Sequence, residues 1–326
     1  MTPALHPLRI GTRASALAVW QTERVRARLA ELGYATERVE IRTTGDVVQE
    51  LPLSRLGGRA FFTKQLDDAM LEGRIDIAVH SLKDLPTELP AGITLGAVGL
   101  REDAHDALVA REGLLWSTLP KTAVIATSSQ RRRAQLLRAS PDLRLSDIRG
   151  NVDTRLEKLE RRADWSAIVL AAAGLIRLGL GARISESLPF EVMLPAPGQG
   201  ALAATVRVDD RVSGEAVHRA LHDEATALAV SAERALLRRL EGGCQVPVGA
   251  HATIERQADR TIVELWGRVV ALDGKASVEG RRSGPATTVE EADALGAALA
   301  EDLLIEGAEN ILRSIRDVAA QPIPEP

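Results

Sequence analysis

The chain has few aromatic residues and almost no cysteine. Only 2% of its 326 residues are Phe, Trp or Tyr, so it lacks the rows of base-stacking aromatics on which many single-strand nucleic-acid binders depend. The net charge of −4 and the pI near 6.0 also argue against a generally basic, nucleic-acid-binding surface. The one cysteine, Cys244, excludes an internal disulfide and any cysteine-based zinc site. Such sparse cysteine is typical of a reducing compartment, and we expect a cytoplasmic protein.

Long apolar runs and an export signal are missing as well. The N-terminus has no charged region followed by an apolar stretch, and the longest apolar run, residues 167–176, is too short to cross a bilayer. We therefore expect neither secretion nor membrane insertion. Lysine is scarce, with 5 residues against 36 arginines. Because arginine is spread over every segment, only its local clusters carry information about function.

The rest of the composition is that of a folded protein with more than one domain. Hydrophobic residues make up 45% of the chain, charged residues 26%, and the mean hydropathy is −0.03. At 326 residues the chain is longer than one core usually holds, which predicts two or three domains.

Strands and helices alternate over the first two thirds of the chain. Residues 8–11 predict a strand, and Ser15 then caps a helical pattern that Gly33 closes. The next elements are a strand at 39–42, a helix at 63–72 and a strand at 75–79. From about Asp106 the pattern restarts, with strands at 107–110, 123–126, 143–145 and 167–170 and helices at 129–138, 152–162 and 171–178. This alternation favours largely parallel sheets.

The last part of the chain follows a proline-rich connection. Residues 201–208 predict a strand that returns to the sheet of the first domain. Beyond it we expect a helix at 214–239, strands at 251–254, 261–272 and 275–282, and helices at 289–304 and 311–319. The predicted fold is therefore α/β, with two lobes around a cleft and a smaller α+β C-terminal domain. The expected domains are residues 1–104 with 199–213, residues 105–198, and residues 214–326.

Polar loops follow several of the predicted strands, where open α/β sheets place their sites. They are Gly11-Thr-Arg-Ala-Ser15, His80-Ser-Leu-Lys-Asp-Leu-Pro86, Thr127-Ser-Ser-Gln-Arg-Arg-Arg133, Arg149-Gly-Asn-Val-Asp-Thr-Arg155 and Gly174-Leu-Ile-Arg177. Backbone N–H groups, hydroxyls and guanidinium forks in such loops favour an anion. Taken singly, each arginine is as consistent with a solvated surface pair, and Asp84 with a turn residue. Their shared position indicates a polyanionic ligand, with a polycarboxylate as the expected kind.

Common cofactor and metal signatures are absent from the sequence. Gly198-Gln-Gly-Ala-Leu-Ala203 has the spacing of a dinucleotide-binding loop, but it leads into a predicted strand rather than a helix. There is no Walker-A loop and no His-Glu-x-x-His, and the six histidines show no ligand-like spacing. We expect no metal site.

Several segments, taken in order along almost the whole chain, match one known family. They are Gly11-Thr-Arg-Ala-Ser, Gly45-Asp, Gly57-Gly-Arg-Ala-Phe-Phe-Thr-Lys, Asp76-Ile-Ala-Val-His-Ser-Leu-Lys-Asp, Thr127-Ser-Ser with Arg131-Arg132, Arg149-Gly-Asn with Thr154-Arg155, Leu194-Pro-Ala-Pro-Gly-Gln-Gly-Ala and Glu241-Gly-Gly-Cys-Gln-Val-Pro. With these segments the chain resembles the porphobilinogen deaminase family, also called hydroxymethylbilane synthases, of tetrapyrrole biosynthesis. So long an ordered set is highly specific.

The resemblance implies lobes like those of periplasmic binding proteins and a role for each matched residue. Cys244 is implied to hold a dipyrromethane cofactor through a thioether bond, and Asp84 to be the catalytic residue. The implied cofactor-binding residues are Lys83, Ser129, Arg131, Arg132 and Arg155. The implied substrate-binding residues are Arg13, Ser15, Phe62, Arg149 and Arg177.

The resemblance also implies the reaction. A transferase of this family deaminates four porphobilinogen molecules in turn, joins them head to tail on the dipyrromethane primer, and releases hydroxymethylbilane by hydrolysis. It is implied to act as a monomer whose product passes to uroporphyrinogen-III synthase. A fixed carboxylate such as Asp84 is suited to stabilise positive charge on the pyrrole when ammonia leaves. The alternative is a non-catalytic, two-lobed anion-binding or sensor protein, because such proteins share the architecture.

Overall fold

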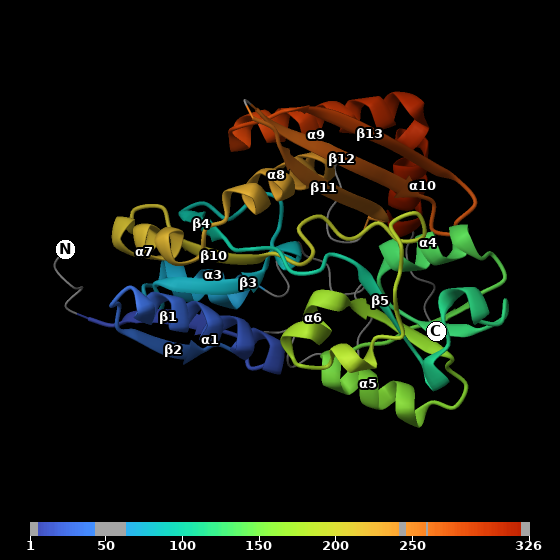
Figure 1. Ribbon diagram of the computed structural model, residues 1–326, viewed down its shortest axis with the longest axis horizontal. Coiled ribbons are helices and arrows are strands. Elements are labelled where there is room, and N and C mark those ends of the chain that lie inside the picture. Colours follow the sequence, from blue (N-terminus) through green and yellow to red (C-terminus); the bar gives the residue numbers. More distant parts are fainter. Residues whose placement is uncertain (1–5, 43–62, 241–245, 259, 321–326) are drawn as a thin grey trace.

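The computed structural model describes residues 6–42, 63–240, 246–258 and 260–320, which form three units (Figure 1). Two of them, the first and second lobes, are each built on a five-stranded sheet, and the third has a three-stranded sheet. The predicted α/β class, with two sheet-containing lobes and a smaller C-terminal unit, is confirmed. In the described part of the chain, no helix is both long and apolar enough for a membrane span.

The sheet of the first lobe contains four strands from residues 8–98 and a fifth from residues 202–207. In spatial order its strands are β2 (Thr36–Glu40), β1 (Leu8–Thr12), β3 (Ile77–Ser81), β10 (Leu202–Arg207) and β4 (Ile93–Val98). Its helices are α1 (Ala16–Glu31), α3 (Lys64–Leu71) and α7 (Arg211–Leu221). Ser15 caps α1 as predicted, since its hydroxyl accepts a hydrogen bond from the Ala18 N–H at 3.4 Å. β10 joins this sheet as predicted.

The second lobe repeats the plan of the first. In spatial order its strands are β7 (Arg144–Ser146), β6 (Val124–Ala126), β8 (Ala167–Ala171), β5 (Asp106–Ala110) and β9 (Glu186–Ser187). Its helices are α4 (Gln130–Ala139), α5 (Val152–Arg161) and α6 (Ala172–Arg177). Both five-stranded sheets are mixed, which corrects the prediction of largely parallel sheets. In each sheet the strand that arrives from the other lobe, β5 or β10, pairs antiparallel to its neighbours.

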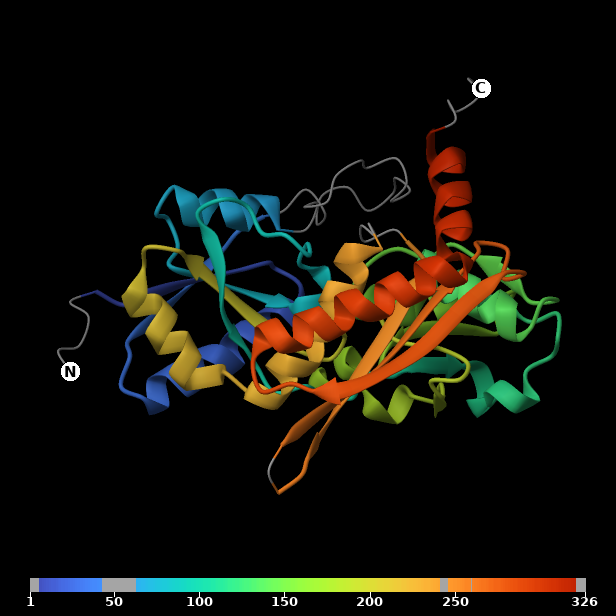
Figure 2. The same cartoon turned by 90° about the horizontal axis from the view of Figure 1, so that it is seen from above.

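The third unit is an antiparallel sheet covered by helices. Its strands are β11 (Val248–Arg256), β12 (Thr261–Val270) and β13 (Ser277–Pro285). Its helices are α8 (Glu224–Arg239), α9 (Val289–Leu303) and α10 (Glu309–Ala320), with a π-helical turn over Leu304–Ala308 before α10. This unit lies across both lobes (Figures 1 and 2), because α8 contacts β4 and β12 contacts α4.

The helix predicted over residues 214–239 is two helices. Asp210 accepts a hydrogen bond from the Ser213 N–H at 3.0 Å, and Asp223 accepts one from the Thr226 N–H at 2.8 Å. Each aspartate therefore caps its own helix, and the chain breaks between them at an extended His222.

The first of these helices belongs to the first lobe. Ala216, Val217 and Ala220 of α7 are buried in the same core as Ile77 of β3 and Val206 of β10. The expected start of the third domain at residue 214 therefore lies inside a helix that packs on the first sheet.

Two chain crossings connect the lobes, and a buried acid holds both of them to the third unit. The first crossing, residues 99–105, joins β4 to β5, and the second, residues 188–201, joins β9 to β10. Glu233 of α8 is fully buried and accepts hydrogen bonds from Arg101 Nη1 at 2.6 Å and from the Gly198 N–H at 2.7 Å. It also accepts one from the Ala252 N–H of β11 at 2.7 Å. Glu233 thus fixes the junction at which the lobes meet.

Candidate active site

Asp84 ends a short 3-10 turn directly after β3. The turn spans Leu82–Asp84, and buried Leu82 and Leu85 anchor it in the core that also contains Val98 of β4. Between these anchors, Lys83 is half-buried and the side chain of Asp84 is exposed. The first lobe therefore presents an ammonium and a carboxylate side by side at the end of a strand.

The second lobe contributes two buried arginines from the start of α4. Ser129 caps this helix by accepting a hydrogen bond from the Arg132 N–H at 3.5 Å. Arg131 and Arg132 are each 6% exposed, and both bind the carboxylate of Asp106 at the start of β5. The shortest nitrogen–oxygen distance is 2.7 Å in each pair.

Asp106 is the acid that holds this arginine pair in place. Burial alone raises the pKa of its carboxyl, but the charges of Arg131 and Arg132 outweigh burial and hold the pKa well below its usual range. Arg131 also donates to the Leu194 carbonyl at 2.7 Å, and Arg132 donates to the Val169 carbonyl at 2.9 Å. These bonds fix the planes of both guanidiniums, each of which still has N–H donors to offer a ligand.

Lys83 lies within electrostatic range of the same arginines. Its Nζ donates a hydrogen bond to Gln199 Oε1 at 3.1 Å. Burial, together with the positive charges of Arg132 and Arg131, lowers the pKa of Lys83 to about 8, against the opposing effect of Asp84 and Asp106. The ammonium of the first lobe and the guanidiniums of the second thus share one site.

Arg155 of α5 extends this group of cations. Its Nε donates to the Gly150 carbonyl at 2.7 Å, which ties the side chain back to the loop before the helix. Burial, together with the charges of Arg132 and Arg149, lowers the pKa of Arg155 to about 10, against the opposing effect of Asp84. Arg149 also lies close by, and burial lowers its pKa as well. Asp84 is therefore flanked by cations from both lobes.

The arrangement has more positive than negative charge. We call Lys83, Arg131, Arg132, Arg149 and Arg155 the cation cluster. Within the described part of the chain, the acids whose charges act on the cluster are Asp84, Asp106 and Asp147. Burying like charges together is unfavourable unless a counter-charge compensates them. The cluster is therefore suited to bind a ligand that carries several carboxylates.

The remaining predicted residues that the structure describes lie on neighbouring elements. Arg13 follows β1, and its charge adds to the burial that lowers the pKa of His80 to about 4. Arg177 ends α6, donates to the Gly200 carbonyl at 2.5 Å, and has its guanidinium carbon 5.9 Å from the centre of the Trp20 ring. Trp20 belongs to α1, the helix that Ser15 caps. Arg177 therefore connects the second lobe to the first near the helix that begins after Arg13.

Two predicted residues lie outside the described residues. They are Phe62, which precedes α3, and Cys244, which falls between α8 and β11. Asp106 and Gln199 are part of the site, although the sequence did not predict a role for either of them. A signal for Asp106 was present, because an acid that opens a strongly apolar strand has to be paired once it is buried.

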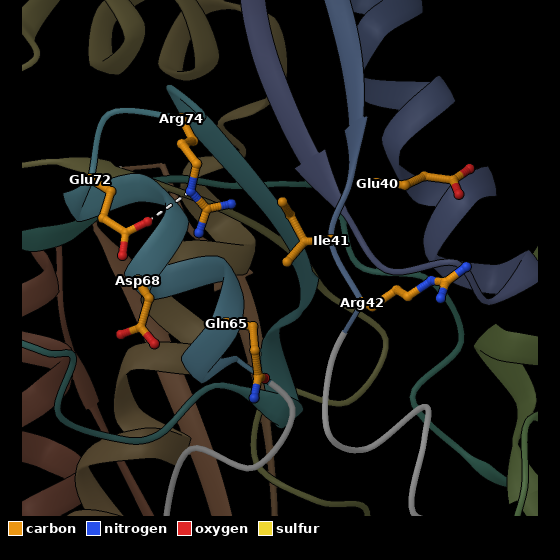
Figure 3. Close-up of a pocket in the computed structure, with 7 residues that line it drawn as sticks. All are labelled: Glu40, Ile41, Arg42, Gln65, Asp68, Glu72 and Arg74. Atoms are coloured by element: carbon orange, nitrogen blue, oxygen red, sulfur yellow. Dashed lines mark hydrogen bonds and ion pairs between the residues drawn. The ribbon is translucent and has the colours of Figure 1, made fainter.

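A surface pocket elsewhere in the first lobe contains none of these residues. It is lined by Glu40, Ile41, Arg42, Gln65, Asp68, Glu72 and Arg74, at the end of β2 and along α3 (Figure 3). Two of its charged side chains pair with each other, since Arg74 Nε donates to Glu72 Oε2 at 2.7 Å. We assign no role to this pocket.

Comparisons with known proteins place the chain in a family. Residues 8–215 match the model described as porphobilinogen deaminase, dipyromethane cofactor binding domain, and residues 227–305 match that of the porphobilinogen deaminase C-terminal domain. Among solved structures, a periplasmic substrate-binding protein of an ABC transporter from Coxiella burnetii has a TM-score of 0.43 and 16% identity, covering 67% of this chain and 93% of that one. The methionine-binding protein MetQ has a TM-score of 0.42 and 11% identity, covering 65% and 89%.

Curated relatives named porphobilinogen deaminase match nearly the whole chain. The protein from Geobacter metallireducens is 48% identical over 318 residues, which cover 96% of this chain and 97% of the relative. The protein from Geotalea uraniireducens is 47% identical over 314 residues, covering 96% of each chain. The protein from Moorella thermoacetica is 46% identical over 311 residues, covering 95% and 96%. The chain therefore belongs to the porphobilinogen deaminase family, transferases that make hydroxymethylbilane, and its residues 8–215 are the domain that binds the dipyrromethane cofactor.

Proposed function

We propose that this chain joins four molecules of porphobilinogen head to tail, with loss of ammonia, and releases hydroxymethylbilane. The observation that carries the proposal is the cation cluster of Lys83, Arg131, Arg132, Arg149 and Arg155 around the exposed carboxylate of Asp84. A site for this reaction has to bind many carboxylates and also stabilise a positive charge on the reacting ring. The cluster supplies the first property and Asp84 the second.

The cluster fits a dipyrromethane held through Cys244. Pyrroles that carry carboxylate side chains supply the negative charge that the cation cluster lacks. In this proposal Lys83, Arg131, Arg132 and Arg155 bind those carboxylates, and Ser129 positions the start of the helix that carries two of the arginines. Cys244 is the only thiol of the chain. When bound, the dipyrromethane supplies the pyrrole chain to which the first substrate is joined.

Asp84 acts on the substrate in this proposal. As the bond between the aminomethyl carbon and nitrogen breaks and ammonia leaves, positive charge develops on the pyrrole ring. A carboxylate about 4 Å from that charge stabilises it by roughly 4 kcal/mol at an effective dielectric constant of about 20. This corresponds to about a thousandfold in rate. The charges of Lys83 and Arg155 act on this carboxylate before the reaction begins, which is the preorganised electrostatic environment that such catalysis needs.

We assign substrate binding to residues at the edge of the cation cluster and near the two chain crossings. We assign the carboxylates of porphobilinogen to Arg13, Arg149 and Arg177, with Ser15 beside Arg13 and Phe62 against the pyrrole ring. Support comes from the contact of Arg177 with the second crossing at Gly200 and with Trp20 of α1. These residues come from both lobes, so a substrate bound between them contacts both.

The division into domains belongs to the same proposal. We assign residues 1–104 and 199–221 to the first domain, residues 105–198 to the second and residues 222–326 to the third. Support comes from the packing of α7 on the first sheet and from the separate core formed by α8, α9 and the third sheet.

We also propose that the chain works as a monomer in the cytoplasm and passes hydroxymethylbilane to uroporphyrinogen-III synthase. The single cysteine supports a reducing compartment. A non-catalytic anion-binding protein is not favoured, because the curated relatives that match almost the whole chain are named as deaminases.

The test is turnover of porphobilinogen by matched variants of one loop. Asp84→Ala should lower kcat by about a hundredfold to a thousandfold, because it removes the charge that acts in the transition state, while Asp84→Glu should retain some activity. Glu88→Ala is the control, since Glu88 is an exposed acid on the same loop. Ammonia release and hydroxymethylbilane formation are measured together. Near-normal kcat in Asp84→Ala would refute the assigned role.

A further inference from the structure

Gln199 lies at the point where the two crossings and the 3-10 turn of the first lobe meet. It belongs to the segment Leu194-Pro-Ala-Pro-Gly-Gln-Gly-Ala, which is one of the segments that resemble the porphobilinogen deaminase family. The proposed reaction gives this segment no role. Its side chain is fully buried. Gln199 Oε1 accepts a hydrogen bond from Lys83 Nζ at 3.1 Å, and its Nε2 donates to the Ala104 carbonyl at 2.8 Å.

These two partners determine the orientation of the amide. An ammonium has only donors and a carbonyl has only acceptors, so the oxygen of Gln199 has to face Lys83 and its nitrogen has to face Ala104. The backbone is also fixed, because Arg101 Nε donates to the Gln199 carbonyl at 2.8 Å. Arg101 is in turn held by Glu233. The second crossing thus holds the amide rigidly against the first crossing.

We propose that Gln199 is a positioning residue that holds the ammonium of Lys83, in its charged form, at the junction of the two lobes. The proposal rests on the proposed role of Lys83 as a carboxylate-binding residue. A neutral acceptor is suited to this task because it stabilises the ammonium without competing for it with a full negative charge. The carboxylates of a ligand can therefore still pair with Lys83.

The charges around Lys83 explain why such an acceptor is needed. Arg131 and Arg132 of α4 disfavour the ammonium, whereas Asp84 on the same turn and Asp106 of β5 favour it. Burial is the largest effect and also disfavours the ammonium, and together these effects bring the pKa of Lys83 to about 8. A hydrogen bond made to the charged form raises the pKa. Removing it should therefore leave more of the amine neutral near physiological pH.

The experiment measures the protonation of Lys83 directly in the unmodified chain and in variants of Gln199. The chain contains only five lysines, so labelling lysine Cε with carbon-13 gives a sparse NMR spectrum in which Lys83→Arg identifies the Lys83 signal. Gln199→Met removes the acceptor at similar volume and should lower the pKa of Lys83 by about 0.5–1. Gln199→Glu replaces the neutral acceptor by a charged one and should raise the pKa of Lys83 above that of the unmodified chain.

Controls separate this effect from general damage. Gln21→Met removes another buried glutamine, whose Nε2 donates to Ser81 Oγ at 2.8 Å, and should leave the titration unchanged, because the acceptor of the Lys83 hydrogen bond is Gln199. Intact mass shows whether all samples carry the same cofactor load. The alkaline limb of the pH profile of kcat/KM should move in the same direction as the NMR titration.

Opposite shifts in the two Gln199 variants would support the positioning role, and a role in packing alone would not produce them. Identical Lys83 titration in all proteins would overturn it, even if one variant folded poorly, because the Gln199→Glu shift is an independent test. Failure of the proposed function gives a different result. In that case Lys83→Met would turn over porphobilinogen normally, whatever the NMR titration shows.

Discussion

Replacing Asp106 by asparagine should destabilise the second lobe severely, because it leaves two guanidiniums buried without their shared counter-charge. Asp106 is fully buried, and the side chains of Arg131 and Arg132 are each 7% exposed. Removing one partner of such a buried ion pair costs about 3–5 kcal/mol. Since about 1.4 kcal/mol is a factor of ten, the equilibrium for opening the lobe should rise roughly a hundredfold or more.

Hydrogen–deuterium exchange read by mass spectrometry is the suitable assay, because a chain with three units does not unfold in two states. Peptides from β5 and α4 should exchange roughly a hundredfold faster in Asp106→Asn, while peptides from β1 and α1 serve as the internal reference. Asp164→Asn is the matched control. Asp164 pairs with Arg162 at the same 2.7 Å but on the surface, where such a pair contributes little.

The contribution of Asp106 to stability should decrease as the pH falls. Because the arginines keep the native pKa of Asp106 below its unfolded value, its contribution is fully present above about pH 4 and is lost as the pH falls further. The difference between the unmodified chain and Asp106→Asn should therefore be constant from about pH 8 to 5 and shrink below about pH 4. Unchanged exchange of β5 and α4 in Asp106→Asn at neutral pH would refute the reasoning.

Two further predictions concern the arginines and the second crossing. Changing Arg131, Arg132 or Arg155 to lysine should impair cofactor assembly, because an ammonium cannot reproduce the bidentate fork of a guanidinium. The same change at Arg13, Arg149 or Arg177 should permit more assembly and hinder substrate addition. Intact mass after limited porphobilinogen counts the pyrrole units, and uniform loading of all six variants would contradict the division. Gly200→Ala should lower the melting temperature, because the residue has a φ of 93° and a Cβ there would lie 2.3 Å from the Glu102 carbonyl oxygen. Gly181→Ala is its control, since a Cβ at Gly181 has no neighbour within 4 Å among the described residues, and equal melting temperatures would contradict the prediction.

Local sequence signals predicted the elements that carry the site. The cap at Ser15 and the left-handed Gly33 bound α1 as expected, because both act within one turn of the helix. The polar loops after β1 and β3 lie at strand ends for the same reason, since an apolar run followed by charged residues marks where a buried strand meets the surface.

Features that depend on distant partners were harder to predict. β4 has no strong alternation, and it contains Gly96, where a Cβ would lie 2.8 Å from Val217 Cγ2 of α7. Its glycine is therefore explained by the packing of a helix more than a hundred residues away in the sequence. The mixed sheets have a similar cause, because β5 and β10 take their direction from the opposite lobe.

The contacts within the site also depend on distant partners and could not be predicted from the sequence. A sequence pattern indicates that arginines gather after strands, but it does not show that Asp106 binds two of them or that Gln199 binds Lys83. Those partners are 25 or more positions apart in the chain. Their pairing follows from the antiparallel entry of β5 and from the two crossings, which only the folded chain brings together.

The intact mass of the purified protein tests the central claim most directly. The claim is that this chain builds hydroxymethylbilane on a dipyrromethane bound to its single thiol, Cys244. The account predicts that the unmodified chain is heavier than its sequence by one dipyrromethane, and that Cys244→Ser has the mass of its sequence and no activity. A fully active protein with the unmodified sequence mass would contradict the account.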